Sequence, residues 1–327
     1  MASILRYGAY LPRPRISVKE IHSFFSKPGR PRSRTLATPG LDEDSLTMAF
    51  EAATEALGPK GASPSAVISV TQSSPFPMRK MSGTLISALG LDGAAAYDVT
   101  GHAGSLMDAL ALGSTIVDSG GGDVLVTASD YVVSHDEKVA DILPAGGAVA
   151  FLLSAKGCCE LGASARVLDE IYDVWYLGRE EEPRYRLEVL AAAYGAAAKG
   201  ALGALEAQTG ISSKDYKIVC ASQPHPSVLR GLGRMVNKDA LANTSFVGEI
   251  GNVGSASVGL AIALGLDGAR KGQKLLALGY GAGEGIAQTL EVTSTTPTIG
   301  VADRLAGTEI SMGTFYRWTR GRQVEPH

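Results

Sequence analysis

The segment YDVTGHAGSL, residues 97–106, has the pattern of a strand that ends in a glycine-containing turn and leads into a helix. In α/β proteins a nucleophile is often held at such a junction. This segment contains no cysteine, and its serine, Ser105, falls inside the expected helix. The turn presents Gly101 and His102. A helix N-terminus favours a neutral imidazole, so His102 is either a general base or donor to a substrate carbonyl, or a residue that bonds to the backbone where the helix starts.

Three other side chains are candidates for chemistry on a carbonyl compound. His225 precedes Pro226 at an expected helix start, so it either faces a cleft or caps the helix. Asn252 lies in a Gly-rich turn, where it could donate to a carbonyl oxygen, although asparagine is common in such turns for conformational reasons. The hydroxyl of Tyr280 could act as an acid, or the ring could simply pack in the core.

An alternation of strands and helices is expected to position these residues. Short apolar runs predict strands at 66–71, 94–99, 123–129, 148–154, 216–222, 273–281 and 286–294. Longer apolar stretches predict helices at 104–120, 188–210 and 225–236, and a Gly/Ser turn that leads into a helix at 251–266. This order favours a mostly parallel sheet covered by helices.

The element order of the first half recurs in the second. We therefore predict an internal duplication, with similar α/β halves at residues 1–155 and 156–300 and a tail at 301–327. Sheets of this type bind ligands at the carboxyl ends of their strands. The turns at 72–77, 101–104, 222–226 and 251–255 are thus expected to lie near one another.

Bulk composition limits the classes of function. Of the 327 residues, 45% are hydrophobic and 19% are charged, which is typical of a globular protein with large buried layers. The formal net charge of −3 gives no reason to expect nucleic acid or an anionic membrane as a partner. Cys158, Cys159 and Cys220 have no metal-binding spacing, so we expect no metal and a reduced, cytoplasmic setting. No apolar run reaches the length of a membrane span.

Several longer motifs resemble the thiolase superfamily, and within it the archaeal-type 3-hydroxy-3-methylglutaryl-CoA (HMG-CoA) synthases. The resemblance spans nearly the whole chain. It rests on YGAYLPRPRISVKEI (7–21), PGLDEDSLTMAFEAATEAL (39–57), PAGGAVAFLL (144–153), IGNVGSASVGLAIAL (250–264) and GYGAGEG (279–285). The resemblance implies an α/β thiolase fold, in which two duplicated halves form αβαβα layers, and a coenzyme A thioester as the ligand.

The chemistry of that family uses three residues: a cysteine that accepts the acyl group, a histidine that assists it, and a glutamate that acts as general acid and base. Matching without gaps places the cysteine position on Gly101, the histidine position on Ser222 and the glutamate position on Gln72. Gly101 cannot form an acyl-enzyme, and neither Ser222 nor Gln72 titrates near neutral pH. Asn252 of the family's Gly-Asn turn is kept. The resemblance thus implies the family's scaffold without its cysteine-based acyl transfer.

A shifted match is the alternative. It places His102 on the cysteine position and His225 on the histidine position, but each shift needs a gap inside a tight turn. The ungapped match is favoured because it keeps the pairs 103–104 and 223–224. The candidate catalytic residues are His102, His225, Asn252 and Tyr280, and the residues expected to contact the CoA ester are Gly251, Asn252, Gly281 and Gly283.

The resemblance favours a subunit of a larger acyl-CoA complex as the function. Thiolase-like proteins work as dimers, and in some assemblies an HMG-CoA-synthase-like chain is held with a true thiolase by a zinc-ribbon/OB-fold acyl-CoA-binding protein. The tail MGTFYRWTRGRQVEP (312–326) resembles the segment that leads into such a zinc ribbon when the two are fused. We therefore expect a homodimer or a dimer with a thiolase-like chain, and a separate zinc-ribbon/OB-fold partner on this tail.

Two other functions are alternatives. A cysteine-independent lyase would catalyse a retro-aldol or Claisen-type cleavage of a CoA ester with His102, His225, Tyr280 and Asn252. An active HMG-CoA synthase or ketoacyl synthase is disfavoured, because the three catalytic positions are substituted.

Overall fold

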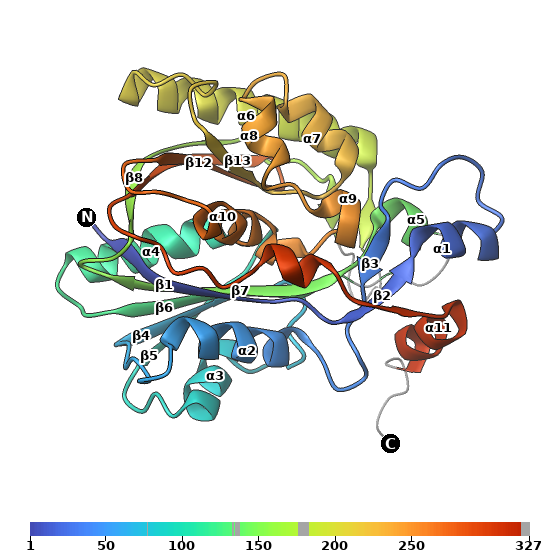
Figure 1. The fold of residues 1–327 in the computed structure, drawn as a ribbon, viewed down its shortest axis with the longest axis horizontal. Coiled ribbons are helices and arrows are strands. Elements are labelled where there is room, and N and C mark those ends of the chain that lie inside the picture. The colour runs from blue at the N-terminus through green and yellow to red at the C-terminus, as the bar shows by residue number, and fades with distance from the viewer. Residues whose placement is uncertain (77, 133, 135–137, 176–182, 322–327) are drawn as a thin grey trace.

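The computed structural model describes residues 1–76, 78–132, 134, 138–175 and 183–321. Its main elements are stacked as helices, sheet, helices, sheet and helices (Figure 1). This is the αβαβα arrangement that the sequence predicted. The helices of one outer layer are α2 (Ser45–Leu57) and α3 (Met81–Leu89), those of the other are α6 (Leu187–Thr209), α7 (Pro226–Leu232) and α8 (Lys238–Ala242), and the central ones are α4 (Leu106–Asp118) and α10 (Ser257–Asp267).

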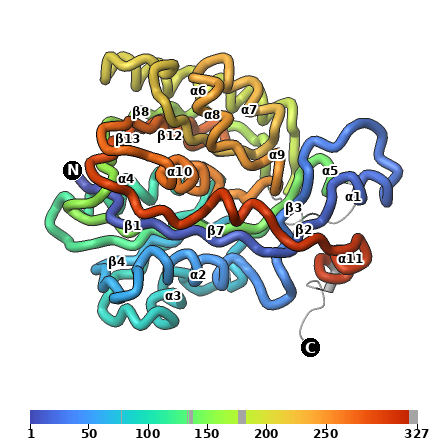
Figure 2. Tube along the Cα trace, in the orientation of Figure 1, coloured from blue at the N-terminus to red at the C-terminus, as the bar shows by residue number. Residues whose placement is uncertain are grey.

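One nine-stranded sheet supplies both β layers, in the order β11-β12-β13-β8-β1-β7-β6-β4-β5. Its strands are β1 (Ser3–Tyr10), β4 (Ala66–Val70), β5 (Ala95–Val99), β6 (Val124–Tyr131), β7 (Gly146–Ser154), β8 (Cys159–Leu168), β11 (Ile218–Ala221), β12 (Lys274–Gly281) and β13 (Glu284–Val292). β1 and β8 are joined through the pairs Ser3–Glu160 and Ile4–Cys159. From this short seam the two parts of the sheet diverge and face each other across α4 and α10 (Figure 2).

The two parts of the sheet repeat one strand order. In the first, β5, β4, β6, β7 and β1 follow one another, and in the second β11, β12, β13 and β8 correspond to β4, β6, β7 and β1. Among the described residues, the second part has no strand that corresponds to β5. The predicted boundary after residue 155 falls between β7 and β8.

Strand directions differ from the prediction of a mostly parallel sheet. β4 runs parallel to β5 and β6, and β11 runs parallel to β12. However, β7 is antiparallel to β1 and β6, and β13 is antiparallel to β12 and β8. The turn Ala282–Gly283 between β12 and β13 explains part of this, because a tight hairpin needs no crossover helix and necessarily reverses the chain.

The main core surrounds the central helix α10. Its sequence SVGLAIALGLD is apolar on every side, which is the pattern of a helix with no solvent-facing surface. Glycine lets it pack closely: a Cβ on Gly259 would overlap Val149 Cγ1 and lie 2.5 Å from Leu106 Cδ2 of α4. Both central helices are therefore held rigidly against the sheet, and their N-terminal turns have defined positions.

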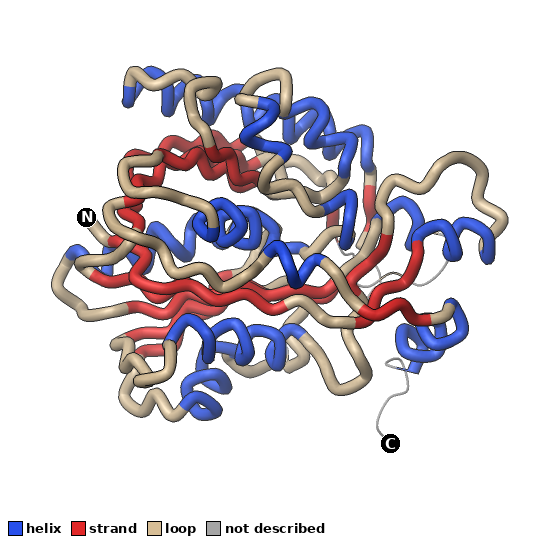
Figure 3. Tube along the Cα trace, in the orientation of Figure 1, coloured by secondary structure: helices blue, strands red, loops and turns tan. Residues whose placement is uncertain are grey.

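A smaller lobe lies at one end of the layers (Figure 3). Its sheet has the order β14-β2-β3. The elements of the lobe are β2 (Pro14–Ser17), α1 (Val18–Phe24), β3 (Thr35–Ala37), α5 (Val139–Ile142), α9 (Val247–Ile250), β14 (Thr308–Ile310) and α11 (Met312–Gly321). The remaining elements are β9 (Val174–Trp175), β10 (Arg184–Tyr185) and the 3₁₀ turns η1 (Gly254–Ala256) and η2 (Ala302–Leu305).

The predicted tail at 301–327 is partly integrated into this lobe. β14 pairs in parallel with β2, and α11 buries Met312 and Phe315 in a cluster with Ile21. Residues 322–326 of the expected docking segment lie outside the described residues. Within the described part of the chain, no helix has both the length and the apolar character needed to cross a bilayer.

Candidate functional site

A cavity of about 310 Å³ lies where the carboxyl ends of β4, β6, β11 and β12 meet. Each of the four turns expected to converge contributes residues to its wall. These residues are Gln72 and Ser73, Gly101, His102 and Ala103, Ser222, Gln223 and Pro224, and Asn252 and Gly254. The convergence follows from the topology, since parallel strands bring their carboxyl ends to one edge of a sheet.

Gly101 has a backbone conformation that suits glycine. Its φ is +147°, a value that residues with a side chain rarely adopt. Space is available there, because the atom nearest to a Cβ at this position would be Ser105 Oγ at 3.7 Å. The turn is held by Thr100, whose hydroxyl donates to Thr71 O at 3.2 Å. The position matched to the family's cysteine therefore opens toward the cavity but disfavours any residue other than glycine.

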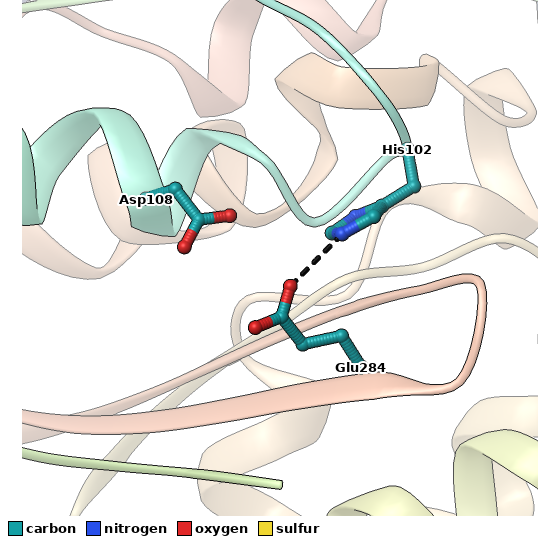
Figure 4. Close-up of side chains that lie close together, drawn as sticks. All are labelled: His102, Asp108 and Glu284. Carbon is teal, nitrogen blue, oxygen red and sulfur yellow. Dashed lines mark hydrogen bonds and ion pairs between the residues drawn. The ribbon is translucent and has the colours of Figure 1, made fainter. Parts of the chain in front are cut away.

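Both ring nitrogens of His102 are engaged, and Figure 4 shows the contact with Glu284. Nδ1 accepts the backbone N–H of Gly104 at 3.1 Å, and Nε2 lies 2.9 Å from Glu284 Oε2. Nδ1 must therefore be unprotonated, and Nε2 carries the proton that it donates to Glu284. The ring also packs over Gly281, where a Cβ would lie 2.5 Å from Nδ1. In this arrangement His102 has no free lone pair with which to accept a substrate proton.

The same histidine belongs to an ion-pair network at the cavity edge. Ligand atoms of His102, Asp108 and Glu284 lie within 4.8 Å of one another, which is close enough for a metal site (Figure 4). The guanidinium of Arg166, however, lies 3.0 Å from Asp108 Oδ1 and 3.3 Å from Glu284 Oε1. Arg166 already balances the two carboxylates, and a divalent cation would have to displace it.

Tyr280 is anchored by a buried carboxylate. Its hydroxyl donates to Asp173 Oδ2 at 2.6 Å and accepts the N–H of Gly283 at 3.3 Å. Burial, and then the hydrogen bond to Asp173, raise the pKa of Tyr280 above its ordinary value. The Tyr280 N–H donates to Ser222 Oγ at 3.1 Å. Both Tyr280 and Ser222 line the cavity, but the phenol proton is committed to Asp173.

His225 is placed differently from the other candidates. It is 2% exposed, is not among the cavity-lining residues, and caps α7 by accepting the N–H of Ser227 at 3.2 Å on Nδ1. Burial, and then the charges of Arg32 and Arg230, lower the pKa of His225 to about 4. The structure thus gives this residue the capping role that was one of the two interpretations of its sequence position.

Asn252 joins the cavity wall to the small lobe. Its backbone N–H donates to Leu143 O at 2.7 Å, and its carbonyl accepts from Ala145 N at 2.9 Å. The side-chain oxygen accepts from Gly254 N at 3.0 Å. Among the described residues, no acceptor pairs with the amide nitrogen of Asn252, which leaves this donor for a ligand.

The glycines expected to contact the ligand divide into two kinds. Gly281 lines the cavity. Gly251 and Gly283 do not, and they permit close backbone packing: a Cβ on Gly251 would lie 2.7 Å from Leu143 O, and one on Gly283 would overlap Asp169 O. Both adopt positive φ angles, +89° and +84°. The fold itself therefore requires glycine at both positions, whatever binds in the cavity.

Asp130 is a site residue that the sequence did not single out. It is 1% exposed and accepts six hydrogen bonds from the described residues. Oδ1 accepts from Thr71 Oγ1, Gln72 N and both N and Oγ of Ser73, at 2.7–3.1 Å. Oδ2 accepts from the N–H of Ser255 at 2.7 Å and from its hydroxyl. This carboxylate clamps the loop after β4 to the η1 turn of the other half.

An aromatic wall on β9 and β10 was also missed. Tyr172, Trp175 and Tyr185 line the cavity, and the guanidinium of Arg186 lies 5.2 Å from the Trp175 ring centroid. The wall is held to the β12–β13 turn by the bond from Ile171 N to Ala282 O at 3.1 Å. The run IYDVW carried the signal, since aromatic residues outside a strong strand or helix pattern often line binding sites.

The thiols lie away from the cavity. Cys158, Cys159 and Cys220 are buried and unpaired, and none lines the cavity. Burial raises the pKa of each thiol. Cys220 faces α10, where a Cβ on Gly265 would lie 3.0 Å from its sulfur.

Comparisons with known proteins agree with this architecture. The chain is 27% identical over 305 residues to a hydroxymethylglutaryl-CoA synthase of Pyrobaculum calidifontis, with 86% of this chain and 85% of the relative covered. It is 28% identical over 313 residues to that of Methanosarcina mazei, with the same coverage. No protein-family model matches the chain.

Solved structures share the fold at lower sequence identity. A crystal structure of an HMG-CoA synthase complexed with CoA superposes with a TM-score of 0.87 at 18% identity, over 97% of this chain and 89% of the other. The 3-oxoacyl-(acyl carrier protein) synthase III of Pseudomonas aeruginosa superposes with a TM-score of 0.78 at 22% identity, over 90% and 99%. The chain thus shares the fold of these synthases and is similar in sequence to the archaeal hydroxymethylglutaryl-CoA synthases.

Proposed function

We propose that this protein binds a CoA thioester in the cavity and acts, without forming an acyl-enzyme, as a subunit of a complex that makes or cleaves carbon–carbon bonds in acyl-CoA compounds. The observation that carries the proposal is Gly101, which occupies the position matched to the acyl-accepting cysteine at a φ of +147°. Two comparisons support a CoA thioester as the ligand: the relatives are named hydroxymethylglutaryl-CoA synthases, and one structure with the same fold is complexed with CoA.

Thiol-based covalent catalysis finds no nucleophile among the described lining residues. Among the described residues, no cysteine lines the cavity, and the buried thiols have raised pKa values. A thioester can instead be held by hydrogen bonds to its carbonyl oxygen. The amide of Asn252 is a donor suited to that role, because its oxygen is already bound to Gly254 N. The cavity is thus equipped to bind and orient a thioester.

None of the candidate catalytic residues named above is available as a general base in the described part of this cavity. His102 donates to Glu284 and accepts from Gly104, while the phenol of Tyr280 is bound to Asp173. His225 does not line the cavity. Condensation or cleavage next to a carbonyl needs proton transfer, so we place that step on a partner chain.

We assign two surfaces to such partners. Among the described strands, β5 lies at an edge of the large sheet and its Tyr97 is 43% exposed, which suits pairing with another thiolase-like chain or a second copy. On the small lobe, Phe24 is 57% exposed and its ring lies 6.2 Å from that of Tyr316 on α11. We assign this aromatic surface to the zinc-ribbon/OB-fold partner, since exposed aromatic residues are enriched at interfaces.

A lyase acting on a β-hydroxyacyl-CoA is the second candidate function. The observation that favours it is the hydrogen bond between Glu284 and His102 of the cavity wall, since a carboxylate that bonds to one ring nitrogen orients the imidazole. A lyase of this kind would turn over the thioester without partners and lose activity in His102→Ala. The proposed subunit would show no turnover alone.

Intact-mass spectrometry after incubation with acetyl-CoA tests the absence of an acyl-enzyme. We expect no acetyl adduct on the wild-type chain. An adduct on a cavity residue would refute the proposal and support an active HMG-CoA synthase or ketoacyl synthase. Purification of the tagged chain from its native host, with and without residues 312–327, tests the partners: a zinc-ribbon/OB-fold protein should be lost with α11, and a thiolase-like chain should be retained.

A further inference from the structure

The walls of the cavity are mainly apolar and aromatic on the side of β9 and β10. Tyr172 and Trp175 lie on one arm and Tyr185 on the other, and the Arg184–Trp175 and Tyr185–Val174 pairs hold the two arms together. Aliphatic side chains complete this side, namely Val132, Ile142, Ile171, Val174 and Leu190. The cavity has a volume of about 310 Å³, which is large enough to hold a small organic group.

The rings are held but not fully packed. The Tyr172 ring meets that of Trp175 edge-on with centroids 6.3 Å apart, and Tyr172 is 68% exposed. Val174, between them in the chain, is 38% exposed. Large apolar side chains that line a cavity and stay this exposed gain favourable contacts when an apolar ligand covers them. An acetyl group would cover little of this surface, whereas an aromatic ring would cover it and add ring–ring contact.

The charge of the cavity lining disfavours acyl groups that carry a carboxylate. Among the described lining residues there is no lysine or arginine, but there are three acids, Asp130, Glu170 and Asp173. Asp130 and Asp173 are each 1% exposed. The lining histidine, His102, is paired with a carboxylate outside the lining. A ligand carboxylate would meet like charge and, among the described lining residues, neither lysine nor arginine, which costs free energy in a partly desolvated site.

We propose that the acyl group bound here is uncharged and aromatic or similarly bulky, as in an arylacyl-CoA, and that neither acetyl nor a carboxylate-bearing acyl group such as glutaryl is preferred. This substrate class rests on the proposed function, since it assumes that the cavity binds a CoA thioester. Tyr172 and Trp175 are assigned as the residues that set the preference.

The test is isothermal titration of the full chain with CoA, acetyl-CoA, benzoyl-CoA and glutaryl-CoA. We expect benzoyl-CoA to bind at least about tenfold more tightly than acetyl-CoA, because its ring buries more apolar surface. Glutaryl-CoA should bind most weakly of the three thioesters. Tyr172→Ala and Trp175→Ala should remove most of the preference for benzoyl-CoA and leave the affinity for CoA itself unchanged. Leu41→Ala is the control, since Leu41 is 61% exposed and outside the lining.

The outcomes separate the two proposals. Failure of CoA and of all three thioesters to bind would overturn the proposed function and this inference together. Binding of CoA with equal affinities for the thioesters, or with acetyl-CoA or glutaryl-CoA preferred, would overturn the inference alone. A loss of affinity in Tyr172→Ala that is equal for CoA and every thioester would also overturn it, because the ring would then contact the CoA arm. Tyr172→Ala keeps the test decisive if Trp175→Ala fails to fold, since Tyr172 is mostly exposed.

Discussion

Replacement of Asp130 by asparagine tests whether this carboxylate holds the two halves of the site together. Asparagine has the same shape but carries one acceptor oxygen and one NH₂ donor. If the NH₂ group faces Ser255, the Ser255 N–H loses its acceptor, which is 2.7 Å away in the wild type. If it faces the other way, the N–H groups of Gln72 and Ser73 lose theirs, at 2.7 and 3.1 Å.

The expected loss follows from these contacts. Leaving a buried donor unsatisfied costs about 1–3 kcal/mol, and the bonds that persist lose the strengthening due to the charge. We expect Asp130→Asn to lower the free energy of unfolding by about 3 kcal/mol. At ~2.1 cal/mol/K per residue over a chain of this length, this corresponds to a decrease in Tm of ~4 °C. CoA-thioester binding should weaken as well, because Gln72 and Ser73 line the cavity.

Urea unfolding monitored by circular dichroism measures this effect, with Asp92→Asn as the matched control. Asp92 is exposed, so its variant should stay within about 0.5 kcal/mol of the wild type. If Asp130→Asn also stays within that range, the six hydrogen bonds do not clamp the two halves of the site together.

Three further substitutions probe other parts of the site. Tyr280→Phe should cost about 2 kcal/mol in urea unfolding, because Asp173, 1% exposed, loses a donor at 2.6 Å; no change would mean that the pair is not formed in solution. Burial lowers the pKa of His225 to about 4 in the folded protein, whereas in the unfolded chain it is about 6.5. Between these pH values protons bind preferentially to the unfolded chain, so the wild type should lose up to ~3 kcal/mol of stability as the pH falls from 6.5 to 4. His225→Asn keeps the cap and should flatten that part of the pH–stability curve, whereas an unchanged slope would contradict the assignment. Gly281→Ala should displace His102, since its Cβ would lie 2.5 Å from Nδ1, at a cost of about 1–3 kcal/mol; an unshifted imidazole NMR signal would argue against that contact.

Much of the secondary structure could be predicted because local patterns were strong. The apolar run at 66–71 became β4, and the Ala-rich stretch at 188–210 became α6 (Leu187–Thr209), which ends at Gly210 in the left-handed conformation. β8 was missed, since CELGASARVL mixes small, polar and apolar residues. That strand is stabilised by its pairing with β13, which lies more than a hundred residues later in the chain, and no local pattern reports such a partner.

The local sequence pattern also could not predict the direction of the strands. Buried parallel and antiparallel strands have similar apolar sequences, so the run at 148–154 was compatible with either. The structure shows it as β7, antiparallel to both β1 and β6. The αβαβα layering was nevertheless predicted, because it followed from a resemblance carried by motifs along most of the chain.

Residue identity alone determined which chemistry the matched positions lack. An acyl-enzyme at the cysteine position needs a nucleophilic atom, and Gly101 has none; a general base needs a titratable group, and neither Ser222 nor Gln72 titrates near neutral pH, whatever the fold. Tertiary structure decided what the remaining polar groups do. His102 is bound to Glu284, 182 positions away, and Tyr280 is bound to Asp173, 107 positions away. Burying a polar group without a hydrogen-bond partner costs free energy. The fold therefore pairs each of these groups with a residue from a distant segment, and no local sequence pattern identifies that residue.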